Sequence, residues 1–272
     1  MNYFNESADF RNPVKIIFKK LRGISPLGRL FIKITLLLFG SFIRIKNPEK
    51  MPLVRQNPVI FAFNHSNSFE TILLAATLIY LRNGRVISFM IDWMFGKIPF
   101  LGLVFRQINP VYVFSKKARW RWLEKRKNKE HHDPVKESLQ RLGENVSLGI
   151  YPEGCRNKNA FRLKRGKPGL GQIVTHSCVK ILPIGIDYVQ RRTRNRIPSI
   201  GRMELIIGDT IDFTELLTIN LCGSHNHHPD NPFLASSITH QVMKELSLLC
   251  GKKYLHNPRI AASADKTLKK GA

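Results

Sequence analysis

The sequence predicts an α/β protein built around one sheet, because short apolar runs alternate with helix-like segments along the chain. The apolar runs have the length of buried strands and lie at residues 58–63, 85–91, 110–114, 146–151, 179–186 and 204–207. The expected helices lie at residues 69–81, 134–142, 166–177 and 234–249. Between them, residues 93–107 are apolar but contain Gly96, Pro99 and Gly102, which predicts short helical turns and a loop.

The composition restricts the class of protein. The chain has 272 residues with 44 Lys and Arg against 19 Asp and Glu, a formal net charge of +25. Because 43% of the residues are hydrophobic, a disordered polycation is excluded. The positive surplus predicts a negatively charged partner, which is nucleic acid, an anionic membrane surface or a phosphorylated substrate. The cysteines form no CxxC pair, which predicts free thiols in a reducing compartment.

Residues 1–47 are predicted to form a basic amphipathic segment that associates with a membrane. Within it, residues 29–46 combine an apolar body with Lys and Arg at both ends. The longest charge-free run, residues 34–43, has ten residues, whereas a helix that spans a bilayer needs about 20. The pattern therefore favours a helix at the membrane interface, and the alternative is a core helix of a soluble domain.

The rest of the chain divides into a catalytic core at 48–215, a loop with a C-terminal helix at 216–257, and a mobile tail at 258–272. Within the core, the basic run 116–129 contains Trp120 and Trp122, which favours contact with a membrane interface over stacking on bases. A polar segment near the C-terminal helix contains four residues that could bind a metal: His225, His227, His228 and Asp230. Short histidine-rich segments of this kind are more typical of a solvated loop.

A candidate catalytic pair follows the first predicted strand of the core. His65 lies just after residues 58–63, and Glu70 lies in the first turn of the next predicted helix. Polar residues at the carboxyl end of a buried strand are typical of α/β active sites. A carboxylate on one imidazole nitrogen would leave the other nitrogen free to accept a proton. The alternative is a structural cap on the helix, with Asn67 as N-cap and Glu70 three residues on.

A second candidate site follows the strand at 146–151. It reads Pro152-Glu153-Gly154-Cys155-Arg156 and is expected to open at the same edge of the sheet. Arg156 could bind a phosphate through two hydrogen bonds, and Gly154 lets the backbone approach a ligand closely. Glu153 could orient that arginine or bind a substrate hydroxyl. The alternative is an ordinary turn with a surface ion pair.

Taken in order, four motifs resemble the glycerolipid acyltransferase family over residues 48–212. They are the His65-x4-Glu70 segment, Lys97 to Gly102, the Glu153-Gly154-x-Arg156 segment and the proline-containing strand 181–184. The best known members of this family acylate lysophosphatidic acid. The resemblance implies a glycerol-3-phosphate acyltransferase-like fold, with a mixed sheet flanked by helices.

The resemblance also implies roles for these residues. His65 would be the general base that deprotonates the acceptor hydroxyl, and Glu70 would orient it from the position where the family usually has Asp. Glu153, Gly154 and Arg156 would match the element that holds the glycerol phosphate of the acceptor. The activated hydroxyl would attack an acyl thioester directly, with no metal or cofactor and with acyl-CoA or an acyl carrier protein as co-substrate.

The family commonly ends the strand after the Lys97–Gly102 motif with an arginine that binds the acceptor phosphate. In this chain Ser115 or Lys116 takes that place, depending on register. A lysine presents a point charge and lacks the two-pronged geometry of a guanidinium. The acceptor can therefore be lysophosphatidic acid or another lysophospholipid.

These observations predict a membrane-associated acyltransferase on the cytoplasmic face, peripheral or monotopic. It would use lysophospholipid acceptors, and the acyl chain would lie in an apolar groove lined by residues between Ile91 and Phe105. The alternative is a non-catalytic basic protein that binds a membrane or nucleic acid through its charge, with nucleic acid the less favoured partner.

Overall fold

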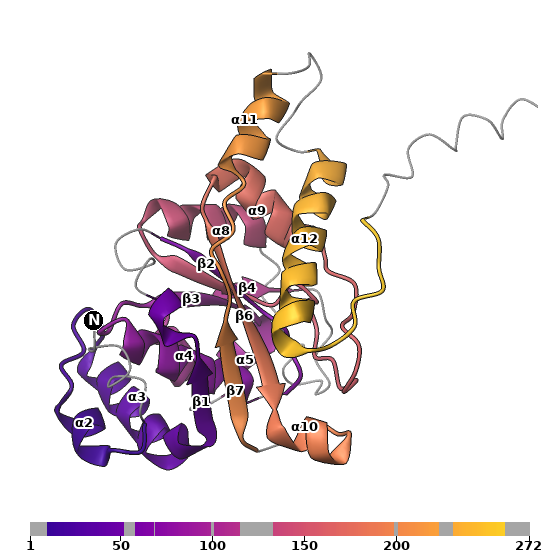
Figure 1. The fold of residues 1–272 in the computed structure, drawn as a ribbon. Coiled ribbons are helices and arrows are strands. Elements are labelled where there is room, and N and C mark those ends of the chain that lie inside the picture. The colour runs from indigo at the N-terminus through magenta and orange to yellow at the C-terminus, as the bar shows by residue number, and fades with distance from the viewer. Residues whose placement is uncertain are drawn as a thin grey trace, which may run out of the picture.

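The computed structural model describes residues 10–51, 58–67, 69–98, 101–114, 133–198, 201–222 and 231–258. Within these ranges one seven-stranded sheet has the order β1-β7-β6-β2-β5-β3-β4 (Figure 1). Its strands are β1 (Ile43–Lys46), β2 (Ile60–Phe63), β3 (Ile87–Asp92), β4 (Val111–Val113), β5 (Ser147–Ile150), β6 (Ile181–Tyr188) and β7 (Met203–Ile207). Neighbouring strands are parallel except for β6 and β7, so the predicted single mixed sheet is confirmed.

Helices cover both faces of this sheet (Figure 1). One core joins the sheet to α3 (Pro26–Phe39) and α4 (Glu70–Leu81), and the other joins it to α8 (Pro134–Gly143), α9 (Gly169–Ser177) and α12 (Pro232–Cys250). Strand β2 is buried throughout and contributes to both. Phe61 and Phe63 belong to the first core, whereas Ile60 and Ala62 belong to the second. This division follows from the alternation of side chains along a strand.

Shorter helices connect these elements. Two of them, α5 (Trp93–Lys97) and α6 (Leu101–Arg106), correspond to the helical turns predicted for residues 93–107. The others are α2 (Pro13–Phe18), η1 (Gly40–Phe42), η2 (Pro48–Lys50), α10 (Val189–Arg194) and α11 (Thr214–Cys222). The last two were not expected from the sequence. Helix α11 occupies a stretch assigned largely to a loop, and Asp212 accepts a hydrogen bond from the backbone N–H of Thr214 at its start.

The N-terminal segment differs from its prediction at one end. The helix expected to continue through residue 46 ends at Phe39, and residues 43–46 form the edge strand β1. The sequence Ile-Arg-Ile-Lys alternates apolar and charged residues with the period of a strand, and β1 pairs in parallel with β7. The predicted boundary after residue 47 assigns β1 to the membrane-associating segment, whereas β1 is a strand of the core sheet.

The mixed topology brings several chain segments to one edge of the sheet. Strands β2, β5 and β6 end at this edge, while β7 and β1 begin there because they run in the opposite direction. Tyr188 at the end of β6 thus pairs with Met203 at the start of β7. Loops from distant parts of the sequence consequently meet at this edge.

Among the helices in the described ranges, none is long and apolar enough to cross a bilayer.

Candidate active site

The loop between β2 and α4 carries His65 and is fixed to the sheet by its first residue. Asn64 is fully buried. Its side-chain amide donates to the carbonyl of Ile186 over 2.9 Å, and its side-chain oxygen accepts from the N–H of the same residue. Both bonds link the loop to β6, which is the neighbour of β2 in the sheet. His65 therefore starts from an anchored backbone.

The carboxylate of Glu70 is the centre of the loop. Its Oε2 lies 2.9 Å from His65 Nδ1 and accepts from the backbone N–H of Ser66 over 2.8 Å. Its Oε1 accepts from the hydroxyl of Tyr188 over 3.0 Å. The N-cap of α4 is Phe69, which contradicts the alternative of Asn67 as N-cap, and Asn67 accepts from the N–H of Phe69.

This arrangement determines the tautomer of His65. An ionised Glu70 carboxylate only accepts hydrogen bonds, so in a neutral His65 it would place the ring hydrogen on Nδ1 and leave the lone pair of Nε2 free. Burial, and then the charge of Glu70, raise the pKa of Tyr188, which keeps its hydroxyl protonated as a donor. The pair therefore has the geometry of a histidine base oriented by a carboxylate.

Tyr151, at the end of β5, holds the imidazole from one side. The two rings stack with centroids 4.1 Å apart and an interplanar angle of 28°. The Tyr151 hydroxyl lies 3.0 Å from Thr71 Oγ1, which joins β5 to the first turn of α4. The histidine side chain remains 15% exposed. The ring is thus fixed in orientation while part of it stays accessible.

Glu153 was predicted to bind the acceptor, but its contacts are with other parts of the protein. It is 2% exposed. Its Oε1 accepts from the backbone N–H of His65, and its Oε2 accepts from the Asn157 side chain and the N–H of Lys164. Burial raises the pKa of this carboxyl, and the hydrogen bonds partly oppose that rise. Because both oxygens are engaged by the protein, Glu153 holds the His65 loop instead of reaching a substrate.

Gly154 and Arg156 lie at the surface beside this buried carboxylate. Gly154 has φ +64°, and a Cβ at this position would come within 2.6 Å of the Lys167 side chain. Only glycine adopts this backbone without strain. Arg156 is exposed, and its carbonyl accepts from Lys164 Nζ over 2.9 Å. The turn therefore presents Arg156 at the edge of the sheet where His65 lies.

Several predicted residues lie outside the described ranges. They are Lys116, the basic run 116–129 with its tryptophans, and the polar loop at 225–230. In the part of the chain that the structure describes, no group of three or more His, Cys, Asp and Glu side chains has the arrangement of a metal site.

Lys252 is a further residue of the site, and it was not predicted from the sequence. It follows α12, is 3% exposed, and donates from Nζ to Ser66 Oγ over 3.0 Å. Burial lowers its pKa, and the negative charges near it include Glu153 and Glu70. Hydrogen bonds between Lys253 and residues Phe161 and Leu163 fix this segment in place. The only signal in the sequence is a lysine pair after a helix, which is also an ordinary surface pattern.

A model of the family described as "Acyltransferase" matches residues 42–187, more than half of the chain. The protein belongs to the acyltransferase family. The predicted family is thereby confirmed. The match includes His65, Glu70, Glu153, Gly154 and Arg156, and it ends before the C-terminal segment that supplies Lys252.

A solved structure with a similar arrangement is the 1-acyl-sn-glycerophosphate (LPA) acyltransferase PlsC from Thermotoga maritima. The comparison covers 80% of this chain and 79% of that one, with 15% sequence identity and a TM-score of 0.48. No curated protein sequence matches the acyltransferase chain.

Replacing Lys252 with Met should lower the free energy of unfolding by about 1–3 kcal/mol, because the buried Ser66 loses a charged donor. The loss should be larger at neutral pH than at mildly acidic pH. A raised pKa in the folded protein means that ionisation of Glu153 costs stability as the pH rises past its ordinary value. Removing a nearby cation increases that cost only while Glu153 is ionised. Urea unfolding at both pH values measures the difference.

Lys244→Met is the matched control, since Lys244 is an exposed lysine on α12. It should change the free energy of unfolding by less than about 0.5 kcal/mol. Equal losses in the two variants, or a loss from Lys252→Met that does not depend on pH, would contradict the assigned contacts.

Proposed function

We propose that the protein transfers a fatty acyl group from an acyl thioester to a hydroxyl of lysophosphatidic acid or a related lysophospholipid. The observation that carries this proposal is the 2.9 Å contact between His65 Nδ1 and a fully buried Glu70, within a chain of the acyltransferase family. The donor would be acyl-CoA or an acylated carrier protein. No metal is needed for the chemistry proposed.

The reaction would begin with removal of the acceptor proton by His65 Nε2. The acceptor oxygen then attacks the thioester carbonyl carbon, forming a C–O bond and a tetrahedral intermediate. Its collapse breaks the C–S bond, and the leaving thiolate takes the proton from the imidazolium. The products are the acylated phospholipid and a free thiol. Glu70 would stabilise the positive imidazole during the reaction through its contact with Nδ1.

The surroundings of Arg156 support an acceptor that carries a phosphate. Basic residues follow it closely in the chain: Lys158, Arg162, Lys164, Arg165 and Lys167. A guanidinium can bind two phosphate oxygens at once. In this proposal Arg156 binds the acceptor phosphate while the hydroxyl approaches His65.

In this proposal the acyl chain lies in an apolar cleft that differs from the groove expected from the sequence. It lies between α3, α4 and α6, and its lining includes Ile32, Ala76 and Phe105. Among the described residues of the predicted stretch between Ile91 and Phe105, Val104 and Phe105 line it. Its volume is about 20 Å³, so a chain would enter only if α3 moved away from α4.

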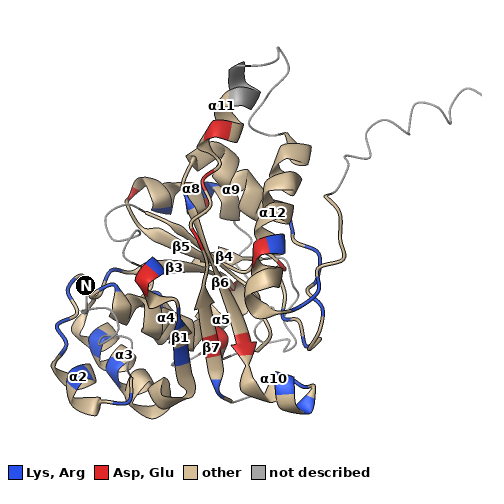
Figure 2. Ribbon diagram, viewed as in Figure 1, with Lys and Arg blue, Asp and Glu red and all other residues tan. Residues whose placement is uncertain are grey.

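Helices α2 and α3 support attachment to the surface of a membrane. They and η1 expose large apolar side chains: Val14, Ile17, Phe18, Leu27, Leu30, Ile34, Leu37, Leu38 and Phe42. Lys and Arg residues lie on the same helices (Figure 2). An apolar face bordered by basic residues is the pattern of a helix that lies in the interface of an anionic bilayer. We propose a peripheral or monotopic protein on this basis.

The His65→Ala variant should lose acyl transfer by a factor of about 10²–10⁴, because it removes the proposed general base. The measurement is release of free thiol from an acyl thioester in the presence of lysophosphatidic acid dispersed in detergent. His176→Ala removes an exposed histidine on α9 and should keep the wild-type rate. Full activity of His65→Ala would overturn the mechanism, and absence of transfer in the wild type with every lysophospholipid tried would favour the non-catalytic alternative.

The double variant Phe18→Ser/Leu38→Ser should bind at least about tenfold more weakly to vesicles of phosphatidylcholine and phosphatidylglycerol in equal parts. Phe18 is 77% exposed and Leu38 is 63% exposed, on α2 and α3. The matched control is Leu248→Ser/Leu255→Ser, which changes side chains that are 75% and 65% exposed elsewhere. Sedimentation with vesicles measures both. Equal weakening in the two double variants would remove α2 and α3 from the membrane contact.

A further inference from the structure

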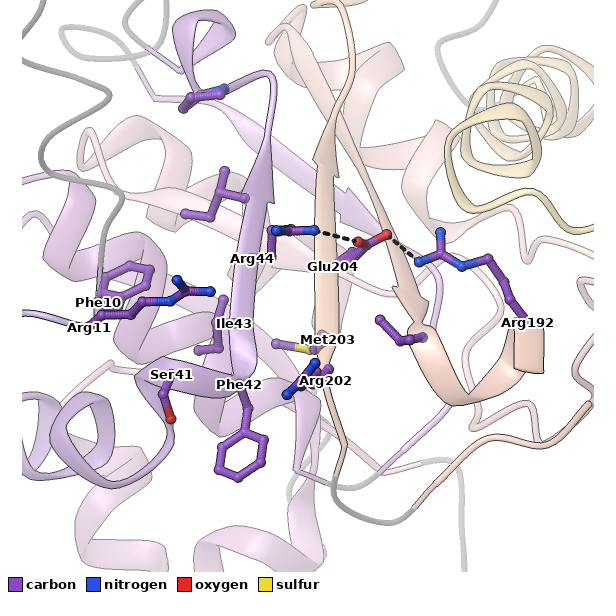
Figure 3. A pocket seen from close by; sticks show the side chains of 13 residues that line it. Phe10, Arg11, Ser41, Phe42, Ile43, Arg44, Arg192, Arg202, Met203 and Glu204 are labelled. Atoms are coloured by element: carbon purple, nitrogen blue, oxygen red, sulfur yellow. Dashed lines mark hydrogen bonds and ion pairs between the residues drawn. The ribbon is translucent and has the colours of Figure 1, made fainter. Parts of the chain in front are cut away.

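A pocket of about 920 Å³ lies where β1 and β7 begin (Figure 3). Its walls come from β1, β7, the start of α10 and the residues before α2. The pocket is at the same edge of the sheet as His65. The Tyr188 hydroxyl that donates to Glu70 lies 3.8 Å from the sulfur of Met203, which lines the pocket. Two side chains therefore separate the pocket from the catalytic pair.

The charge of this pocket is strongly positive. Its lining residues include Arg11, Arg44, Arg192 and Arg202, against one acidic residue, Glu204 (Figure 3). We call it the arginine pocket. A guanidinium stays charged at any physiological pH and presents a planar set of donors that matches phosphate oxygens. Four such groups around one cavity are suited to a phosphate-bearing ligand.

Glu204 offsets only part of the positive charge of the arginine pocket, because this one carboxylate is shared among three cations. Its Oε2 accepts from Lys46 over 2.9 Å and from Arg192 over 2.9 Å, and its Oε1 lies 3.9 Å from Arg44. Burial alone would raise the pKa of Glu204, but the hydrogen bonds from Lys46 and Arg192 lower it on balance. One carboxylate thus faces three cations, and its role is to hold them in the wall.

The apolar face of α2 and α3 leads directly to the arginine pocket. Phe42 lines the pocket, follows the end of α3 and is 40% exposed, and Leu37 and Leu38 precede it on the exposed face. Phe10 and Ile43, both buried, belong to the lining on the same side. A ligand that has both a phosphate and an apolar part would contact both features at once. A membrane phospholipid has this chemistry.

We propose that the arginine pocket binds the phosphate head group of an anionic membrane phospholipid, at a site separate from the one where acyl transfer occurs. The inference rests on the proposed attachment of α2 and α3 to a membrane, but it does not require the acyl-transfer reaction. A lipid bound in this way would orient the protein so that the edge of the sheet with His65 faces the bilayer, from which a lysophospholipid would be supplied.

The test is a charge-matched pair of double variants. Arg44→Gln/Arg202→Gln removes two pocket charges and leaves Lys46 and Arg192 on Glu204. Lys136→Gln/Lys244→Gln removes the same charge from exposed positions on α8 and α12. Affinity is measured for vesicles of phosphatidylcholine and phosphatidylglycerol in equal parts. The pocket variant should bind about 20-fold more weakly than the wild type, and the control should change less than threefold, about 0.6 kcal/mol.

Further arms identify the source of the phosphate and separate this proposal from the catalytic one. Glycerol phosphate in solution should displace the protein from vesicles poorly, because it lacks the apolar part, and displacement at low concentration would instead indicate a site for a free phosphate. The pocket variant should keep the wild-type rate of transfer to detergent-dispersed lysophosphatidic acid, which His65→Ala loses. The assignment would be overturned if the pocket variant lost that rate, or if both double variants bound vesicles equally weakly. It would also be overturned if the pocket variant bound duplex DNA more weakly while its binding to vesicles was unchanged.

Discussion

Glu70 places a carboxylate in the interior of the protein, beneath the loop that follows β2. A buried carboxylate without partners would be strongly unfavourable, and this one is stabilised by three hydrogen-bond donors. The Ser66 N–H and the His65 ring come from the loop itself, and the Tyr188 hydroxyl comes from β6. The conformation of the loop, the start of α4 and the end of β6 are therefore coupled through one side chain.

Two further buried ionisable side chains extend this coupling to distant parts of the chain. Glu153, after β5, accepts from the backbone of His65, and Lys252, after α12, donates to the side chain of Ser66. Both interactions require the loop to hold its folded conformation, because Glu153 or Lys252 would otherwise lose a partner while buried, which is costly. The position of His65 thus depends on segments more than 80 residues away along the chain. The interior of the site is built from polar contacts, whereas the two cores on either side of the sheet are apolar.

Much of the fold follows from local sequence patterns, and the site follows only in part. The apolar run at β2 and the helix α4 are encoded by neighbouring residues, so they were predictable, as was the closeness of His65 and Glu70 across a short loop. Strand β1 was missed because its alternating pattern covers only four residues directly after an apolar helix, and the strand depends on β7 for pairing. The roles of Glu153 and Lys252 depend on contacts far apart in sequence, and no local pattern distinguishes a buried lysine from one on the surface.

The tautomer of His65 tests the arrangement around Glu70 most directly. It can be read from the nitrogen chemical shifts of histidine in the isotopically labelled protein, with His65→Ala used to assign the signal. If Glu70 is an ionised acceptor facing Nδ1, His65 in its neutral form carries its hydrogen on Nδ1, and Nε2 shows the shift of an unprotonated nitrogen. A neutral His65 with its hydrogen on Nε2, or one that exchanges between both forms as free imidazole does, would contradict the proposed base and its orientation by Glu70.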